Sequence, residues 1–354
     1  MSTPQFEGWM GLDEKSAEGN MKWQTYEAKT WTEDDIDIEI SHCGVCGSDL
    51  HTLRSGWGAT PYPAVVGHEI VGKAIRVGSN TKRGIKVGDR VGVGAQSKSC
   101  LKPDCEMCSS GIENHCTNDF VQTYGMKYPN GDMAQGGYAK YWRGSGHFVF
   151  KIPEGVKSEA AAPMLCGGVT TYSPLRQNGC GPGKKVGIIG IGGLGHFGLL
   201  WAKALGADKV VAISRSRSKE EDARKMGADE FIATGEEGWQ EKHAASLDLV
   251  VSTVSNPKMP FEGYLSLLGY KGKFVQLGLP EDPMPSFGAA SLIMKSVSVS
   301  GSLIGSPQEI EEMLQLAADK NVQAWIQIRP MKDANQVIQD FDKGMPRYRY
   351  CLVN

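Results

Sequence analysis

The sequence lacks an excess of charge of either sign. Among 354 residues, 38 basic and 40 acidic side chains leave a formal net charge of -2. This balance gives no electrostatic reason to expect nucleic acid or an anionic membrane as a partner. A long apolar run is also missing, because the most apolar stretch, residues 186–201, carries a histidine and six glycines and is shorter than the ~20 residues of a membrane span. Residues 1–20 show no signal-peptide pattern, so we expect a cytoplasmic protein.

Helical periodicity is scarce before residue 158 and regular after it. A chain of this length exceeds one typical core, which predicts two domains. Short strands separated by Gly and Pro are expected at residues 36–40, 70–77 and 90–93. Helices then alternate with apolar strands at residues 185–189, 209–213, 248–252, 274–278 and 296–300, a pattern typical of a parallel sheet covered on both faces. We predict an α/β protein in which residues 1–158 and 302–354 form a β-rich domain and residues 159–301 form a doubly wound parallel-sheet domain.

A glycine-rich turn connects the strand at residues 185–189 to a helix. It reads Gly190-Ile191-Gly192-Gly193-Leu194-Gly195. The first glycines allow a tight turn and a close approach of the backbone to a pyrophosphate, Gly195 allows close packing of helix on strand, and the helix N-terminus offers free N–H groups. Strand, turn and helix together predict a Rossmann dinucleotide site.

The second strand of this unit lacks the acidic residue that usually binds the ribose of NAD. It ends instead in Ser214-Arg215-Ser216-Arg217-Ser218-Lys219. Hydroxyls with guanidinium and ammonium groups suit a 2′-phosphate, so we expect NADP(H), bound by Ser214, Arg215, Ser216 and Lys219. The alternative is a solvated basic turn that caps the next helix through Ser218.

Nine cysteines without an export signal are better explained as metal ligands or buried thiols than as disulfides. Four of them, Cys100, Cys105, Cys108 and Cys116, lie within seventeen residues. Four thiolates can enclose one Zn²⁺ tetrahedrally, which is the chemistry of a structural site. Unrelated thiols or two disulfides are the alternatives, and His115 is the substitute ligand should Cys100 lie elsewhere.

A second candidate metal site is dispersed over Cys46, His68 and Cys166. Three nitrogen and sulfur ligands plus water make an open zinc site, which polarises a carbonyl or acidifies an alcohol. Spacing alone leaves other interpretations open: Cys43 and Cys46 also fit a redox pair or half of a zinc knuckle, and Cys166 fits a buried apolar thiol.

These residues carry a resemblance that runs nearly end to end. The chain resembles the zinc-dependent medium-chain alcohol dehydrogenases, in particular the cinnamyl alcohol dehydrogenase branch. The shared motifs are Cys46-Gly-Ser48-Asp49-Leu-His51, Gly67-His68-Glu69-x-x-Gly72, the four-cysteine lobe, Cys166-Gly-Gly-x-Thr170, the glycine turn with His196, and Gly301-Ser302-x-Ile304-Gly305-Ser306. One departure stands out: four residues separate Cys100 from Cys105 where most relatives have two.

The resemblance implies a GroES-like catalytic domain beside the Rossmann domain, two zinc ions per chain and bound NADP(H). Cys46, His68 and Cys166 are expected to ligate the catalytic zinc, with Glu69 beside the metal and Asp49 orienting His68. Ser48 would pass a proton through the cofactor ribose to His51. The nicotinamide is expected near Thr170, Val254, Ser302 and Ile304, and the pyrophosphate near Arg347.

The expected activity is a zinc- and NADP(H)-dependent interconversion of primary alcohols and aldehydes, with zinc as Lewis acid. Trp57 is a candidate wall of the substrate pocket, which favours aromatic or cinnamyl aldehydes, or medium-chain ones. The strand at residues 296–300 lies at a sheet edge where relatives pair, so a homodimer is expected. The alternatives are a zinc polyol dehydrogenase, whose metal set usually lacks the thiolate of Cys166, a zinc-free quinone reductase, and a nucleotide-binding protein without catalysis.

Overall fold

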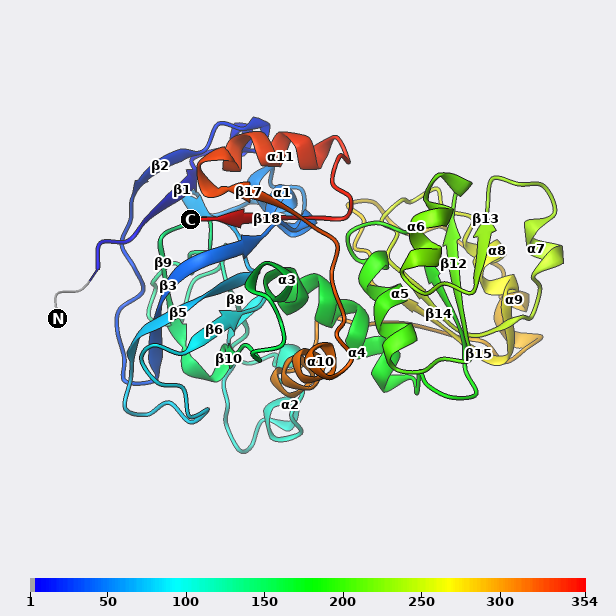
Figure 1. Ribbon diagram of the computed structural model, residues 1–354, viewed down its shortest axis with the longest axis horizontal. Helices are drawn as coiled ribbons and strands as arrows, with labels where there is room; N and C mark the ends of the chain where they lie inside the picture. The colour runs from blue at the N-terminus through cyan, green and yellow to red at the C-terminus, as the bar shows by residue number, and fades with distance from the viewer. Residues whose placement is uncertain (1–3) are drawn as a thin grey trace. The chain divides into compact units, whose positions relative to one another are not determined.

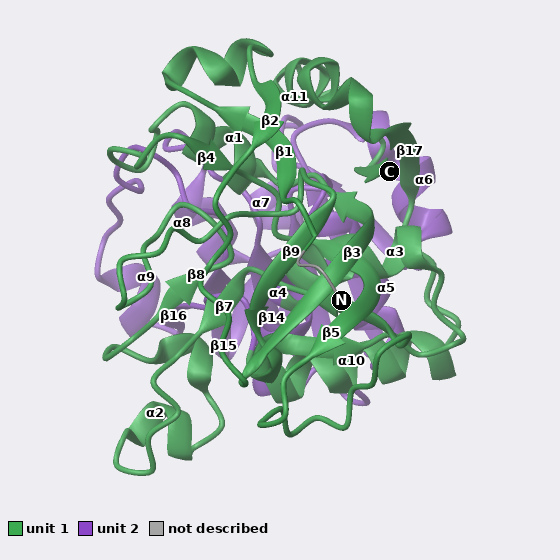
Figure 2. Cartoon of the chain, turned by 90° about the vertical axis from the view of Figure 1, so that its left-hand side faces the viewer, with its two compact units in different colours: residues 1–169, 306–354 green, residues 170–305 purple. Residues whose placement is uncertain are grey.

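The computed structural model describes residues 4–354, and its backbone contacts divide the chain into two compact units (Figure 2). Unit 1 comprises Met1–Val169 and Ser306–Asn354, and unit 2 comprises Thr170–Gly305. The first boundary follows residue 169 because helix α3 (Ser158–Pro163) contacts strands of unit 1. Across residues 4–354, no helix combines the length and apolar character that a membrane crossing requires.

Unit 1 is built on a seven-stranded, mostly antiparallel sheet (Figure 1). Its strands run in the order β10-β6-β5-β3-β18-β17, and β9 also pairs with β3. Their bounds are β3 Asp35–Gly44, β5 Ile70–Val77, β6 Arg90–Val93, β9 Tyr141–Ser145, β10 Val149–Lys151, β17 Ile326–Pro330 and β18 Arg349–Val353. The last segment of the sequence therefore lies inside the sheet, between β3 and β17.

Unit 1 also contains two smaller sheets. They contain β1 Glu7–Gly11, β2 Lys22–Thr25 and β4 Ala64–Val65 in one, and β7 Gln96–Lys98 with β8 Val121–Gln122 in the other. Ile36, Ile38 and Ile40 of β3 are buried in the core. The neighbouring aspartates, Asp35 and Asp37, are also buried, in ion pairs with Lys29 and Arg143.

Unit 1 also contains several α-helices and one π-helical turn. They are α1 Gly47–Leu53, α2 Glu106–Ser109, α3, a π-helical turn Met164–Gly168, α10 Pro307–Asp319 and α11 Ala334–Asp342. Helix α10 begins where the sequence favours it: the Ser306 hydroxyl accepts from the N–H of Glu309, the Glu309 carboxylate accepts from the N–H of Ser306, and Pro307 occupies the first turn.

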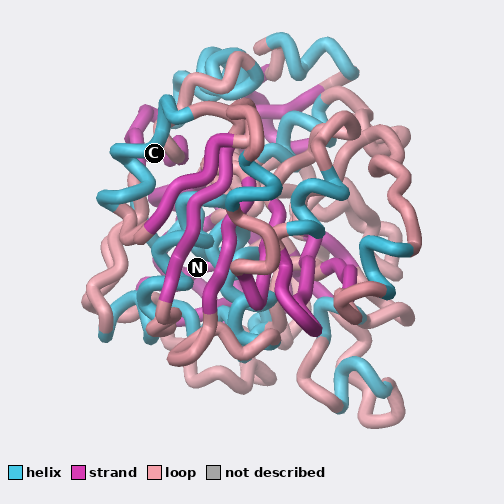
Figure 3. Tube along the Cα trace, turned by 90° about the vertical axis from the view of Figure 1, so that its right-hand side faces the viewer, coloured by secondary structure: helices cyan, strands magenta, loops and turns pink. Residues whose placement is uncertain are grey.

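Unit 2 is a six-stranded parallel sheet in the order β13-β12-β11-β14-β15-β16 (Figure 3, strands in magenta). The strands are β11 Lys185–Ile189, β12 Lys209–Ser214, β13 Glu230–Ala233, β14 Leu247–Ser252, β15 Leu268–Gln276 and β16 Ser298–Gly301. Numbered within the unit, this is the 3-2-1-4-5-6 order of a Rossmann fold, and it confirms the predicted fold class. The sequence analysis missed β13, a short strand of four residues.

Helices connect the parallel strands, as the crossover rule requires. They are α5 Gly195–Ala204, α6 Glu220–Lys225, α7 Trp239–Lys242, α8 Phe261–Ser266 and α9 Ala290–Ile293, while α4 Val169–Gln177 precedes the first strand. The strand order reverses between β11 and β14, so the carboxyl ends of these strands mark the place where ligands bind in such sheets.

Candidate metal and nucleotide sites

The dispersed candidate ligands come together in unit 1. Ligand atoms of Cys46, His68, Glu69 and Cys166 all lie within 4.8 Å of one another. All four side chains are buried, and the Sγ atoms of Cys46 and Cys166 are 4.0 Å apart. Nitrogen and sulfur donors at this spacing suit Zn²⁺.

Three separate segments supply these ligands. Cys46 precedes helix α1, His68 and Glu69 lie directly before β5, and Cys166 lies in the π-helical turn that follows α3. At Gly67 the backbone adopts φ +98°, and a Cβ there would lie 2.5 Å from the Tyr138 ring. Glycine at this position therefore lets the chain turn tightly just before His68.

Asp49 connects two of the segments from its position in the first turn of α1. Its carboxylate accepts hydrogen bonds from the N–H of Cys46 at 2.9 Å, the N–H of Gly67 at 3.1 Å and the Tyr138 hydroxyl at 3.0 Å. The fully buried carboxylate thus fixes the backbone at one ligand and beside another. Its expected action on the His68 ring stays a prediction.

Glu69 connects the site to the far end of the sequence. Its buried carboxylate forms an ion pair with the buried guanidinium of Arg349, the first residue of β18. The same carboxylate accepts from the N–H of Gly167 at 3.2 Å, next to Cys166. Oε2 of Glu69 has no hydrogen-bond partner, so this oxygen has capacity to bind a cation.

The electrostatics of the ligand set favour a cation. The hydrogen bond between Cys46 and Cys166 holds the pKa of Cys46 well below the usual range, although burial acts to raise this pKa. Burial lowers the pKa of His68, but Cys46, Asp49 and Glu69 together outweigh this effect and raise the pKa to about 9. The buried Nε2 of His68 has no hydrogen-bond partner. A divalent cation would replace the proton on the imidazole and satisfy this nitrogen, so the residues present fit a zinc ion.

The four-cysteine lobe is also assembled. Ligand atoms of Cys100, Cys105, Cys108 and Cys116 lie within 4.8 Å of one another. The widened spacing does not displace Cys100, because Leu101 adopts φ +51° and the chain turns back immediately. Burial raises the pKa of Cys116, but backbone N–H groups, that of Cys100 first, outweigh it and lower the value to about 6. His115 is not part of the group.

Three other predicted residues lie on or after helix α1. The Ser48 hydroxyl is 3.6 Å from Sγ of Cys46. The ring of Trp57 stacks on that of His51 with centroids 4.3 Å apart, and Arg54 lies 3.1 Å from Nδ1 of His51. Ser48 is therefore adjacent to the metal ligands, whereas the rings of His51 and Trp57 form a partly exposed pair.

The glycine turn has the geometry that the motif predicts. Gly190 adopts φ +85°, and a Cβ on Gly195 would lie 1.9 Å from the carbonyl oxygen of Gly190, so strand and helix pack directly. A Cβ on Gly192 would meet nothing within 4 Å, so the turn is open at that point. Leu194 immediately precedes helix α5, and Gly193 O lies 2.9 Å from Nδ1 of His196.

The basic residues after β12 differ in their surroundings. Arg217 forms ion pairs with Glu236 and Glu220. Arg215 is exposed at the end of the strand. Lys219 lies beside the glycine turn, where its ammonium group donates to the carbonyl of Ile191 at 2.7 Å. The side chain of Ser216 lies 3.1 Å from that of Ser218.

The predicted nicotinamide residues of unit 2 follow the carboxyl ends of neighbouring strands. The Gln276 amide donates to the carbonyl of Val254 at 2.8 Å, and the N–H of Ser302 donates to the carbonyl of Gln276 at 3.3 Å. Ile304 follows with φ +41°, and Thr170 begins the unit. Arg347 belongs to unit 1, where its side chain is exposed and its N–H donates to Gln327.

Two buried residues at the metal site were missed by the sequence analysis. The first is Arg349. The sequence does hold a signal for it, because a charged residue inside the apolar run Tyr348-Arg349-Tyr350-Cys351-Leu352 indicates a buried, paired charge. Tyr124 is the other: its ring stacks on His68 with centroids 5.1 Å apart and an angle of 9°. Nothing in its sequence neighbourhood distinguishes Tyr124 from an ordinary core tyrosine.

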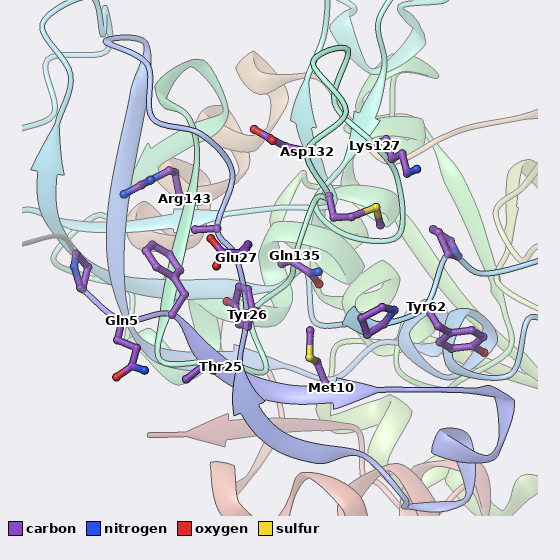
Figure 4. Close-up of a pocket in the computed structure, with 16 residues that line it drawn as sticks. Gln5, Met10, Thr25, Tyr26, Glu27, Tyr62, Lys127, Asp132, Gln135 and Arg143 are labelled. Atoms are coloured by element: carbon purple, nitrogen blue, oxygen red, sulfur yellow. The ribbon is translucent and has the colours of Figure 1, made fainter.

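A pocket of about 940 Å³ lies elsewhere in unit 1, beside strands β1 and β2 (Figure 4). Its walls include Phe6, Tyr26, Tyr62, Asp132 and Arg143. None of the predicted site residues lines it, so it has no part in the chemistry of the metal cluster.

Comparison with known proteins identifies the class. The zinc-binding dehydrogenase family model matches residues 193–319, and the alcohol dehydrogenase GroES-like domain model matches residues 32–154. NADP-dependent alcohol dehydrogenase 6 of Saccharomyces cerevisiae is 46% identical over 359 aligned residues, which cover 100% of this chain and 98% of that protein. The chain therefore belongs to the zinc-binding medium-chain alcohol dehydrogenases.

Solved structures narrow this assignment to one branch. A cinnamyl alcohol dehydrogenase from Sorghum bicolor superposes with a TM-score of 0.92 at 35% identity, covering 99% of this chain and 98% of the other. The cinnamyl alcohol dehydrogenase of Helicobacter pylori, solved with NADP(H), gives 0.89 at 30% identity over 99% and 98% of the two chains. Within the family, the chain belongs to the cinnamyl alcohol dehydrogenase branch, as its motifs predicted.

Replacing Asp49 by Asn tests whether its hydrogen bonds hold the candidate metal ligands in position. The amide can no longer accept all three hydrogen bonds, so we expect zinc affinity to fall about 10- to 100-fold. The measurement is zinc retention against a competing chelator. Tyr138→Phe removes only one of the three bonds and should lose less. A variant Asp49→Asn that retains zinc like the wild type would contradict this role.

Proposed function

We propose that this protein interconverts primary alcohols and aldehydes as a zinc- and NADP(H)-dependent oxidoreductase, with aromatic or cinnamyl aldehydes as preferred substrates. The observation that carries the proposal is the buried cluster of Cys46, His68 and Cys166, whose donor atoms meet although 120 residues separate the two thiols. A merely structural site would be closed by a fourth thiolate; here the fourth group is Glu69, whose carboxylate is held by Arg349.

The three ligands would hold the catalytic zinc in this cluster. When bound, the metal supplies Lewis acidity to a carbonyl or alcohol oxygen. The protein contributes fixed ligand positions, through Asp49 and Glu69, and excludes water by burying all the ligands. The second zinc would be held by the four-cysteine lobe, where no open position is left.

Proton transfer is assigned to Ser48 and His51. A hydroxyl donates and accepts at once, so Ser48 beside Cys46 suits a relay next to the reacting oxygen. An imidazole can both donate and accept a proton, and the ring of His51 is partly exposed, which suits it for exchange with solvent. Trp57 stacks on His51, and we assign its exposed ring to one wall of the pocket for an aromatic substrate.

The cofactor preference is assigned to the end of β12. No carboxylate is available there for a ribose 2′-hydroxyl, and Arg217 is occupied by Glu236 and Glu220. Arg215 and Lys219, with the hydroxyls of Ser214 and Ser216, are the groups proposed for a 2′-phosphate. The names of the yeast and Helicobacter relatives support this assignment.

Two single variants, Arg215→Ala and Arg217→Ala, test the proposed activity and the preference for NADP(H). Wild-type protein should oxidise NADPH with cinnamaldehyde. A hydrogen bond to a charged group contributes about 1.5–3 kcal/mol. In the variant Arg215→Ala we therefore expect NADPH binding to weaken about 10- to 100-fold, with NADH binding nearly unchanged. In the variant Arg217→Ala the binding of both cofactors should change little. Steady-state kinetics with both cofactors measures this. Equal losses for the two cofactors would refute the phosphate site, and no turnover with either would refute the activity.

His51→Gln tests the proton relay. In alcohol oxidation the variant lacks a local proton acceptor, so turnover should slow most at low pH, where hydroxide is scarce. The pH–rate profile of alcohol oxidation measures the effect, with Arg54→Gln as a control that alters a neighbour and leaves the imidazole. A profile identical to that of the wild type would remove His51 from the mechanism.

We also infer a homodimer formed through β16. This strand ends the parallel sheet, and all four of its residues are exposed. It has no charge or proline to discourage pairing. Val299→Asp should give a monomer by light scattering, whereas Val87→Asp, an exposed apolar position in unit 1, should leave the dimer intact. A monomeric wild type would contradict the inference.

A further inference from the structure

The four thiols of the cysteine lobe are unequally accessible. Cys105 and Cys116 are buried, whereas Cys100 and Cys108 are only partly buried. Both of the accessible cysteines line an open pocket of about 800 Å³ in unit 1, together with Ser99, Leu101 and His147. A small polar molecule in solvent can therefore reach two of the four proposed zinc ligands.

The same two thiols are close to each other, one in helix α2 (Cys108) and the other directly before a segment without helix or strand (Cys100). Sγ of Cys100 is 3.6 Å from Sγ of Cys108. The residues between Cys100 and Cys105 are all exposed and lie outside helices and strands. A disulfide has an S–S length of about 2.05 Å, so the two sulfurs need to approach by roughly 1.5 Å, and no helix or strand holds the residues that follow Cys100.

We propose that Cys100 and Cys108 are an oxidisable pair, and that hydrogen peroxide converts them to a disulfide with release of the zinc of this lobe. One thiolate attacks the peroxide: an S–O bond forms, the O–O bond breaks and hydroxide leaves. The second thiolate attacks the sulfenic sulfur, the S–S bond forms and a second hydroxide leaves. Two electrons pass from the sulfurs to the peroxide, and solvent protons convert the hydroxides to water.

Release of the metal follows from the loss of ligands. After oxidation only Cys105 and Cys116 remain as thiolates, and a structural zinc site needs four ligands. By comparison, the thiols of the dispersed cluster are shielded from solvent. Its Cys46 and Cys166 are 8% and 5% exposed, and their Sγ atoms are 4.0 Å apart.

Treatment of the zinc-loaded protein with hydrogen peroxide tests the proposal without reference to enzyme activity. A metallochromic chelator follows zinc release, and peptide mapping under non-reducing conditions identifies the disulfides. We expect the first zinc per chain to leave as the Cys100–Cys108 disulfide forms, and to rebind after reduction with a thiol. A first disulfide between Cys46 and Cys166, or first zinc release without a Cys100–Cys108 bond, would overturn the proposal.

A shortened segment provides the matched variant. Deletion of Lys102 and Pro103 leaves two residues between Cys100 and Cys105 and touches no proposed ligand. If the variant holds two zincs, its peroxide-driven release should be at least about tenfold slower than in the wild type; an equal rate would contradict the role of the segment. Should the deletion prevent zinc loading, the disulfide map of the wild type still decides the proposal.

Discussion

The metal cluster depends on two buried carboxylates. Burying a carboxylate is costly unless hydrogen bonds or an opposite charge compensate it. Asp49 is compensated by backbone N–H groups of the Cys46 and Gly67 segments, and Glu69 by Arg349 and the N–H of Gly167. Each compensating group belongs to, or lies beside, a segment that supplies a ligand. Satisfying the carboxylates therefore places the ligands, and the cluster forms as a consequence of ordinary hydrogen bonding.

This arrangement explains why the protein can hold two kinds of metal site. In the cysteine lobe four thiolates come from one short stretch, so local chain geometry is enough to gather them. In the dispersed cluster the ligands are far apart in sequence, and only the folded sheet brings them together. The cysteine lobe offers four thiols, whereas the dispersed cluster includes the carboxylate of Glu69, of which one oxygen pairs with Arg349 and Oε2 has no hydrogen-bond partner.

The sequence predicted the periodic and motif-bearing parts of the molecule well. Five of the six strands of unit 2 followed from apolar runs bounded by glycine, whereas β13 was missed, and Gly190 and Gly195 lie as the motif requires. The cysteine lobe followed from its spacing, and the structure shows that a left-handed Leu101 absorbs the two additional residues. The dispersed cluster required a family resemblance, because spacing left Cys43 and Cys166 ambiguous. Arg349 was missed because its partner is 280 residues away, and Tyr124 because stacking leaves no pattern in sequence.

The position of β18 has a consequence for how the protein is made. This strand lies between β3 and β17 and delivers Arg349 to Glu69. During synthesis, domains usually fold as they emerge, N-terminal parts first. Unit 1 is an exception, because residues 349–353 complete its sheet only after all of unit 2 has left the ribosome. Until then Glu69 lacks its ion pair with Arg349, so the candidate metal ligands of the nascent chain lie in an unfinished sheet.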